Sequence, residues 1–379
     1  MIVPATRHYF SEEDIEFIVR HFTEILQGNS YLTMYKYGEQ FERAFAAYVG
    51  SEYAVGCNSG TSALELICRG LDLANKEVIL PSNTFVASAN AVLNAGGIPV
   101  FADCGNDMCM SADDAISRIT PQTGAIMQVH IGGIVSPSTL QLQRVCRERG
   151  LHLIEDAAQA HGSELHGTKA GTFGVAAGFS FFSTKVLTTG EGGMVTTSDP
   201  ALADKMKSLR EFGKMPRGIY VNVYSAMGYN WRLPEVASLM GIRQLASIER
   251  FLKRRRELAA IYDAAFANNA DIRLIEPADK ARHNYFKYLI LLPNHDRVAV
   301  HKALRAHGVQ PSGYVYELPL HKQPVFPKAN SLSLPKTEYV CEHHFSPPIF
   351  FGMSDDEAHY VATTLNKVLV ELNSTGVKP

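Results

Sequence analysis

A lysine and an acidic residue stand out because each closely follows an apolar run typical of a buried strand. Lys185 lies in 180-SFFSTKVLTTGEGGMVTT-197, and Asp156 ends the run 151-LHLIED-156. A lysine removed from water has a lowered pKa and can attack a carbonyl carbon. A buried carboxylate is costly unless it meets a cation or hydrogen-bond donors. Asp156 therefore either caps the next helix or keeps a ligand nitrogen protonated.

A third segment could bind an anion. In 57-CNSGTSALEL-66, Gly60 and Thr61 lead directly into an apolar-periodic helix, whose N-terminus offers free N–H groups. Ser and Thr before a helix are also ordinary N-caps, so this signal alone is weak. Ser183, two residues before Lys185, could add a second phosphate contact. A lysine, a carboxylate and a Gly/Ser/Thr phosphate cup are the groups that catalysis with pyridoxal 5'-phosphate (PLP) requires.

Seven short apolar runs, separated by helical patterns, must position these groups. They are 54-AVGC-57, 78-VIL-80, 98-IPVFAD-103, 125-AIMQVHI-131, 151-LHLIED-156, 177-AGFSFF-182 and 193-GMVTT-197. Alternation of this kind predicts a mostly parallel sheet with helices on both faces, and ligands bind at the carboxyl ends of such strands. The last two runs are close together, which leaves a different pairing open for them. Two adjacent strand ends could then place Asp156 and Lys185 around a single ring.

The remaining patterns predict a second, smaller domain. A capping box at Ser11 starts an N-terminal helix. A long helical stretch after Pro234 runs to about Ala267 and suits a connector. A strand over 285–292, a helix over 298–306 and a last helix from 355 to about 372 follow. We expect a large domain over residues 1–240 and a small α/β domain over 241–379 that includes the connector. The basic run 253–256 is interpreted as a solvated helix face rather than a phosphate contact.

Composition restricts the class of protein. The chain has 379 residues, 46% of them hydrophobic and 20% charged, which is typical of a folded protein with two domains. A net charge of −2 gives no field that argues for nucleic acid or an anionic membrane. There is no signal-peptide core and no long apolar stretch, and the six cysteines form no CxxC pair, so we expect a cytoplasmic protein. Cys341, His343 and His344 lack a second ligand pair, and we expect no metal.

Many segments, in the right order, match one known family. They are CNSGTSAL at 57–64, LPSNTFVASANAVLNAGGIPVFADC at 80–104, VH at 129–130, IEDAAQAHGS at 154–163, SFFSTKVLTTGEGGMV at 180–195, GYNWRLPEVAS at 228–238, and Tyr316 with PLH at 319–321. Over nearly its whole length the chain resembles the PLP-dependent sugar aminotransferases of the DegT/DnrJ/EryC1/StrS family. This resemblance implies the aspartate-aminotransferase fold, PLP fold type I. It also implies a homodimer with shared active sites.

The resemblance assigns roles to individual residues. Lys185 would hold PLP as a Schiff base, and Asp156 would pair with the pyridine nitrogen. The other implied cofactor contacts are Gln159 near the ring hydroxyl or the Schiff base, Gly60, Thr61 and Ser183 at the phosphate, Phe85 stacked on the ring, and Asn230 at the phosphate of the neighbouring subunit. Tyr316 and His321 would contact the sugar nucleotide, although core packing is the alternative for these two and for Phe85.

The expected reaction also comes from the resemblance. L-Glutamate would donate its amino group, leaving pyridoxamine phosphate, which would aminate a nucleoside-diphosphate keto-deoxy-sugar. The best candidate is dTDP-4-keto-6-deoxy-D-glucose, and a 3-keto sugar or a cyclitol is the alternative. A sugar dehydratase of the same fold would carry histidine in place of Lys185. A non-catalytic PLP-binding regulator is a further alternative. The segments 130-HIGGIVSP-137 and 31-YLTMYKYGEQFE-42 depart from the family pattern and are expected to border the substrate pocket.

Overall fold

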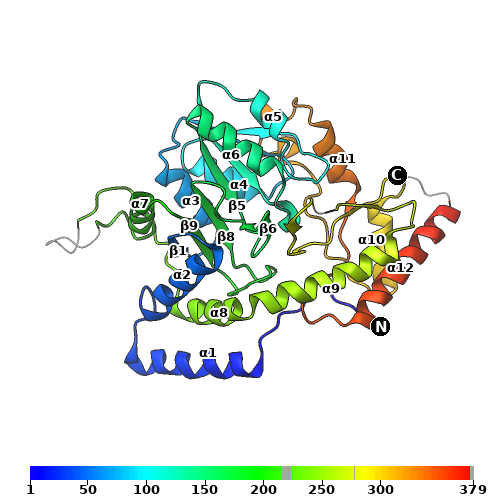
Figure 1. The fold of residues 1–379 in the computed structure, drawn as a ribbon, viewed down its shortest axis with the longest axis horizontal. Helices are drawn as coiled ribbons and strands as arrows, with labels where there is room; N and C mark the ends of the chain where they lie inside the picture. Colours follow the sequence, from blue (N-terminus) through cyan, green and yellow to red (C-terminus); the bar gives the residue numbers. More distant parts are fainter. Residues whose placement is uncertain (216–222, 277, 376–379) are drawn as a thin grey trace.

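The computed structural model describes residues 1–215, 223–276 and 278–375 (Figure 1). Its central element is a seven-stranded sheet with the order β1-β9-β8-β5-β4-β2-β3. The strands are β1 (Tyr53–Cys57), β2 (Glu77–Pro81), β3 (Ile98–Ala102), β4 (Thr123–Val129), β5 (His152–Asp156), β8 (Ala176–Ser180) and β9 (Gly193–Thr197). All seven strand predictions are confirmed. Strand β9 runs antiparallel to both β1 and β8, whereas β8, β5, β4, β2 and β3 are parallel to one another.

Both faces of this sheet are covered, which is why its strands read as short continuous apolar runs. Along β2, Val78 and Leu80 lie in the core that contains side chains of α3, α4 and α7. Ile79 between them lies in the opposite core, with side chains of α2, α6 and α8. The bounds of the helices around the sheet are α2 (Lys36–Val49), α3 (Gly60–Gly70), α4 (Val86–Asn94), α5 (Ala112–Ser117), α6 (Ser138–Arg149), α7 (Pro200–Arg210) and α8 (Glu235–Ala246).

The N-terminal segment begins as predicted. Helix α1 (Glu12–Glu24) is capped by Ser11, whose hydroxyl accepts from the Asp14 amide while the Asp14 carboxylate accepts from the Ser11 amide. A short π-helix, η1 (Ile25–Asn29), follows. Single-turn 3-10 helices are η2 (Ile131–Gly133), η3 (Leu320–Lys322) and η4 (Pro327–Ala329).

The connector predicted as one helix is two. Helix α8 ends at Ala246, and Ser247, with a φ of −100° and a ψ of 0°, is its C-cap. Helix α9 (Ile248–Phe266) then continues toward the C-terminal part of the chain (Figure 1). Helices α9, α10 (Arg297–Ala306) and α12 (Asp355–Thr375) enclose a separate core, and α11 (Pro335–His343) lies nearer the large sheet. The first residues join that core, because Val3 is buried in it and pairs with Val309.

Two other expectations for the C-terminal part were wrong. The strand predicted over 285–292 is limited to β12 (Ile290–Leu291): Tyr285 has a φ of +48° that no strand allows, and Phe286 and Lys287 form a bend. Strand β12 lies between β10 (Arg273–Leu274) and β13 (His344–Phe345). In the basic run, Arg255 is buried instead of solvated and donates to the carbonyls of Tyr285 and Ile349 at 2.8 and 3.0 Å.

A small sheet joins the two parts of the chain. Strand β11 (Ala281–Arg282) pairs with β6 (Glu164–Leu165), which in turn pairs with β7 (Thr168–Lys169). Strands β6 and β7 lie between β5 and β8 in sequence, so this sheet anchors the C-terminal part beside the strand ends that carry Asp156 and Lys185. Among the described residues, no helix is both long enough and apolar enough to span a membrane.

Candidate active site

Lys185 lies in the loop that follows β8. Its amide donates to the carbonyl of Phe182, three residues earlier, at 2.9 Å and so closes a main-chain turn. Its Nζ lies 4.7 Å from the centroid of the Phe286 ring, which comes from the C-terminal part of the chain. Burial lowers the pKa of Lys185 to about 8, although the neighbouring Asp156 opposes this shift. A lysine with this pKa is a usable nucleophile and base near neutral pH.

Asp156 ends β5, which pairs directly with β8, so the predicted meeting of the two strand ends is observed. Its carboxylate is buried and accepts from the Ser88 hydroxyl at 2.7 Å and from the Ala158 amide at 3.2 Å. Burial raises the pKa of Asp156, and the Ser88 hydrogen bond and Lys185 oppose the rise. In the described part of the chain, no cation lies within ion-pair distance of this carboxylate. A buried carboxylate without a counter-charge fits a bound pyridinium nitrogen.

The predicted phosphate cup also has free donors. Ser59 caps α3 by accepting from the Ser62 amide, and within the described residues the amides of Gly60 and Thr61 donate to no acceptor. The Ser183 hydroxyl has no hydrogen-bond partner there either. A Cβ at Gly60 would lie 2.7 Å from the Cβ of Ser180, so only glycine lets the helix start approach the end of β8 this closely. Together with Asp156 and Lys185, these residues fit PLP.

Gln159 connects the two parts of the chain at the site. Its Oε1 accepts from the Gly132 amide at 2.7 Å, and its Nε2 donates to the Tyr316 hydroxyl at 2.7 Å. The Tyr316 ring lies 6.5 Å, centroid to centroid, from the ring of Phe85, which is 60% exposed at the start of α4. Phe85 is therefore free to contact a ligand, and the hydrogen bond of Gly132 brings the segment 130–137 into contact with Gln159.

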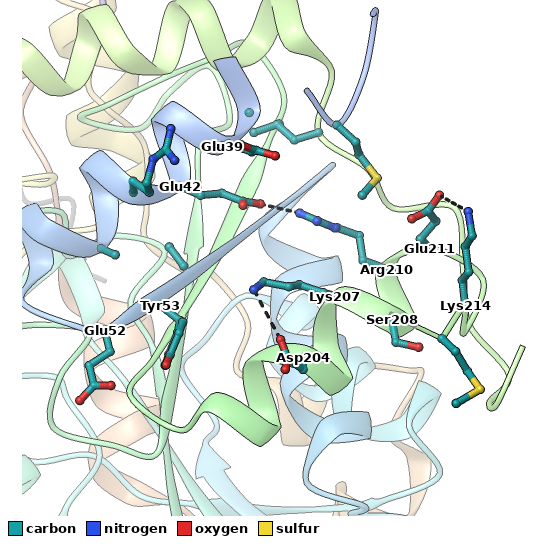
Figure 2. Close-up of a pocket in the computed structure, with 17 residues that line it drawn as sticks. Glu39, Glu42, Glu52, Tyr53, Asp204, Lys207, Ser208, Arg210, Glu211 and Lys214 are labelled. Carbon is teal, nitrogen blue, oxygen red and sulfur yellow. Dashed lines mark hydrogen bonds and ion pairs between the residues drawn. The ribbon is translucent and has the colours of Figure 1, made fainter. Parts of the chain in front are cut away.

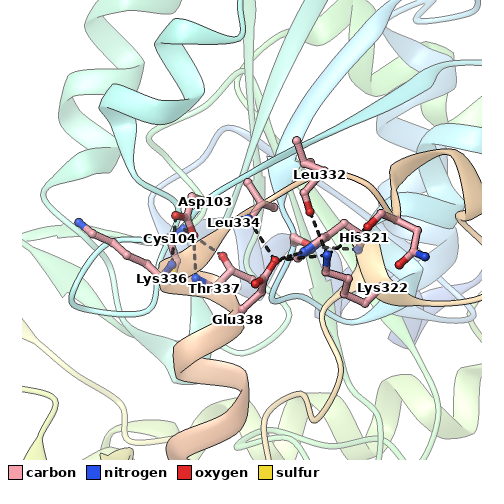
Figure 3. Close-up of polar contacts among 11 residues, drawn as sticks. Asp103, Cys104, His321, Lys322, Leu332, Leu334, Lys336, Thr337 and Glu338 are labelled. Atoms are coloured by element: carbon pink, nitrogen blue, oxygen red, sulfur yellow. Dashed lines mark hydrogen bonds and ion pairs between the residues drawn. The ribbon is translucent and has the colours of Figure 1, made fainter.

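His321 does not point an unused nitrogen toward a ligand. Its Nδ1 lies 2.7 Å from the Ser82 hydroxyl and its Nε2 lies 2.9 Å from the Glu338 carboxylate, and the whole side chain is buried (Figure 3). Nearby, the Asp103 carboxylate accepts from the Thr337 amide at 2.7 Å. These contacts tie the segment 320–338 to the ends of β2 and β3. The core-packing alternative raised for His321 from the sequence is the one its surroundings support.

Asn230 is exposed at the edge of the molecule. Its main chain pairs with Glu211, and the rings on either side of it, Tyr229 and Trp231, stack with centroids 4.0 Å apart. The Trp231 carbonyl accepts from the Asn58 amide at 3.0 Å, close to the start of α3. The Asn230 side chain has no hydrogen-bond partner among the described residues. Of the loop 214–227 that precedes it, residues 216–222 lie outside the described residues.

A cavity of about 640 Å³ lies away from this site, between α2 and α7 (Figure 2). Its walls carry both charges, and several of these form pairs, as Lys207 does with Asp204 and Lys214 with Glu211. Neither Lys185 nor Asp156 lines it. This cavity lacks an unpaired buried carboxylate and a desolvated lysine, so we assign the chemistry to the strand ends.

Sequence reasoning missed three residues at the site. Ser88, whose hydroxyl donates to Asp156, lies in the segment 80–104 that matches the family, but no spacing in the sequence indicates a role for it. Phe286 and Lys287 fall in the predicted strand, and nothing in their spacing indicates a position beside Lys185.

No group of His, Cys, Asp or Glu in the described ranges could hold a metal ion. His343 and His344 instead bond the carbonyls of Tyr339 and Val340.

Comparison with known sequences gives one consistent answer. The model of the DegT/DnrJ/EryC1/StrS aminotransferase family matches residues 12–366. GDP-perosamine synthase of Caulobacter vibrioides is 35% identical over 340 residues, 87% of this chain and 90% of that protein. A dTDP-4-dehydro-2,3,6-trideoxy-D-glucose 4-aminotransferase of Saccharopolyspora spinosa is 34% identical over 346 residues, 87% and 88% of the two chains.

Solved structures agree with the sequence comparison. PseC of Helicobacter pylori, an aminotransferase of pseudaminic acid biosynthesis, superposes with a TM-score of 0.90 at 27% identity, over 98% of this chain and all of that one. NtdA of Bacillus subtilis, solved with bound pyridoxamine phosphate, gives a TM-score of 0.86 at 25% identity, over 95% and 83% of the two chains. The expected fold type I architecture is confirmed. The chain belongs to the DegT/DnrJ/EryC1/StrS aminotransferase family and is a PLP-dependent sugar aminotransferase.

Proposed function

We propose that this enzyme transfers an amino group from L-glutamate to a nucleoside-diphosphate keto-deoxy-sugar, with dTDP-4-keto-6-deoxy-D-glucose as the best candidate and a 4-amino-4,6-dideoxy sugar as the product. The observation that carries the proposal is the pairing of a desolvated lysine with a buried, uncompensated carboxylate at neighbouring strand ends. The Saccharopolyspora relative, named as a dTDP-sugar 4-aminotransferase, supports the choice of nucleotide and carbon.

The proposed residue roles are those that the family pattern implies, and the contacts at the site support them. Lys185 would hold the cofactor and, once released, would take a proton from the α-carbon of the donor, since its lowered pKa leaves much of the amine neutral near pH 8. Asp156, oriented by Ser88, would keep the pyridine nitrogen protonated. The free amides of Gly60 and Thr61 and the Ser183 hydroxyl would bind the phosphate. When bound, PLP supplies an electron sink for the charge left on the α-carbon.

The substrate side of the site is proposed to involve residues from both parts of the chain. Phe85 would stack on the cofactor ring, and Gln159 would contact its hydroxyl edge while holding Tyr316 in place. Tyr316 would then face the sugar. His321 is assigned a positioning role, because Ser82 and Glu338 already occupy both of its ring nitrogens. It would hold the segment that carries the sugar-binding surface.

We also propose a homodimer with shared sites. Tyr31, Leu32 and Met227 are apolar yet 70%, 63% and 88% exposed, and exposed apolar groups are typical of a subunit interface. Asn230, exposed and without a side-chain partner in the described ranges, would reach the phosphate cup of the other subunit. Co-refolding Lys185→Ala with Asn230→Ala subunits should then restore part of the activity. Formation of mixed dimers without restored activity would place Asn230 in its own subunit's site.

The substrate is tested directly. The holoenzyme is incubated with L-glutamate and a panel of 4-keto and 3-keto sugar nucleotides and a keto-cyclitol, and the products are identified by mass spectrometry and NMR. We expect amination of dTDP-4-keto-6-deoxy-D-glucose, and no amination by Lys185→Ala. Preferred amination of a 3-keto sugar or a cyclitol would select that alternative instead. Loss of a hydroxyl without gain of nitrogen would indicate a dehydratase, which the lysine at position 185 argues against.

A further inference from the structure

A second lysine lies close to Lys185. The Nζ of Lys287 is 5.5 Å from the centroid of the Phe286 ring, and the Nζ of Lys185 is 4.7 Å from the same centroid. The two ammonium groups can therefore be no farther apart than the sum of these distances. Lys287 is partly buried, and its Nζ donates to the Ser312 carbonyl at 2.6 Å. Its main chain is also close to the site, because its amide donates to the Gly132 carbonyl at 3.2 Å.

The charge of Lys287 is not compensated in the part of the chain that the structure describes. Neither Lys287 nor the buried Arg255 forms an ion pair there. Arg255 donates to main-chain carbonyls, and Asp263, an acidic side chain that approaches this segment, accepts from the Tyr288 hydroxyl at 2.6 Å. Burial, with Arg255 and Lys185 nearby, lowers the pKa of Lys287 to about 8. Holding the Lys287 ammonium near other cations without a carboxylate costs free energy, and a bound anion would lower that cost.

We propose that Lys287 Nζ binds the carboxylate of the amino donor. This rests on the proposed function, in which the donor's α-carbon comes to Lys185 for proton transfer. The α-carboxylate is attached to that carbon, so it must lie near Lys185, and Lys287 contacts the same Phe286 ring as Lys185. An ammonium has three donors, and the Ser312 carbonyl uses one of them, so two remain for a carboxylate.

The other anion that enters the site is the diphosphate of the sugar nucleotide. A diphosphate is larger than a carboxylate and carries a nucleoside, whereas Lys287 is partly buried against the Phe286 ring and the main chain at Ser312. A compact carboxylate fits this place better. The donor's carboxylate also departs with the keto acid, so Lys287 would have no ligand when the sugar nucleotide binds.

The test measures binding without turnover. Glutarate, a dicarboxylate that has no amino group to transfer, is titrated into the PLP holoenzyme by calorimetry, and dTDP is titrated separately. We expect Lys287→Met to weaken glutarate binding about 10- to 100-fold, the effect of losing one charge-assisted hydrogen bond, and to leave dTDP binding unchanged. Lys287→Arg should retain most of the glutarate affinity.

Lys169→Met is the matched control. Lys169 also donates to a main-chain carbonyl, that of Tyr48 at 2.9 Å, and lies 4.3 Å from the centroid of an aromatic ring, but it is on β7 and outside the site. The Lys169→Met variant should bind glutarate with the affinity of the wild type. Thermal unfolding and the visible absorbance of bound PLP establish that each variant is folded and loaded.

Three results would overturn the inference: no measurable glutarate binding to the wild type, equal glutarate affinity in Lys287→Met, or a loss of dTDP binding with glutarate binding intact. The last would identify the diphosphate as the ligand of Lys287. Failure of the proposed function is seen separately, because the wild-type holoenzyme would then not convert bound PLP to pyridoxamine phosphate with L-glutamate. An enzyme that makes this conversion while Lys287→Met binds glutarate normally refutes only the inference.

Discussion

Replacing Asp156 with Asn should move activity and stability in opposite directions. The carboxylate is buried, accepts from Ser88 and Ala158, and has no cation within ion-pair distance among the described residues. Its pKa is raised by burial, so in the cofactor-free protein at neutral pH the ionised group costs folding free energy. An acid whose folded pKa exceeds its unfolded pKa stabilises the fold when protonated and loses that contribution as pH rises. Asparagine keeps the shape without the charge.

The loss of activity can be estimated from the same contacts. With PLP bound, Asp156 and the pyridinium would form a buried charge pair, and removing one partner of such a pair costs about 3–5 kcal/mol. At about 1.4 kcal/mol for each tenfold change in rate, transamination should slow by at least ~10²-fold. Ser88→Ala, which removes only one hydrogen bond to Asp156, should slow it less than tenfold.

Two assays on the same variant separate these effects. Single-turnover conversion of bound PLP by L-glutamate, followed by visible absorbance, gives the rate. Urea unfolding of the cofactor-free protein at pH 7.5, a value chosen above the ordinary range of a carboxyl pKa, gives the free energy. We expect Asp156→Asn to be slower as holoenzyme and at least as stable as the wild type without cofactor. Near-native turnover, or a cofactor-free variant destabilised by more than about 1 kcal/mol, would refute the account of a carboxylate kept for its charge.

Three more predictions follow from the site. The pKa of Lys185 is about 8 in the folded chain against an ordinary 10.5, so between these pH values the unfolded chain holds a proton that the folded chain has lost. The free energy of unfolding of the cofactor-free protein should therefore rise over this pH range, and rise less in Lys185→Met. Equal slopes of unfolding free energy against pH in the two proteins would contradict the shift. Tyr316→Phe removes the 2.7 Å hydrogen bond to Gln159 and should raise the KM for the sugar nucleotide about fivefold, with an unchanged absorbance of bound PLP. A changed absorbance with an unchanged KM would indicate that Tyr316 contacts the cofactor instead. His321→Ala should lower the free energy of unfolding by about 1–3 kcal/mol, because it removes the hydrogen bonds of a buried imidazole to Ser82 and Glu338. Unchanged stability with a raised KM for the sugar would restore a direct substrate contact.

The sheet and its two principal residues were predictable because the signals are local and strong. Strands covered on both faces appear as short apolar runs, and the carboxyl ends of parallel strands meet at one edge, so Asp156 and Lys185 had to be close once their strands were neighbours. The antiparallel pairing of β8 and β9 agrees with the connection between them, residues 181–192, which contains no crossover helix.

The features that were missed depend on contacts between residues far apart in sequence. The break between α8 and α9 at Ser247 could not be predicted, because no proline or glycine lies there. Arg255 appears as one of four basic residues in a row, and only the packing of Tyr285 and Ile349 against α9 shows that it is buried. The same holds for His321, whose partners are Ser82, directly after β2, and Glu338 in α11. Helical spacing reports which face a residue occupies, but not which loop of another segment covers that face.

The central claim is that Lys185 is the residue that binds the cofactor. The most direct test is reduction of the PLP-loaded enzyme with borohydride, followed by proteolysis and mass mapping of the modified peptide. Lys287 makes the test discriminating, because burial lowers its pKa to about 8 as well and it lies beside the same Phe286 ring. The account predicts a single reduced PLP adduct on Lys185, and none on Lys287 in either the wild type or Lys185→Ala. An adduct on Lys287 or any other lysine in the wild type would contradict it.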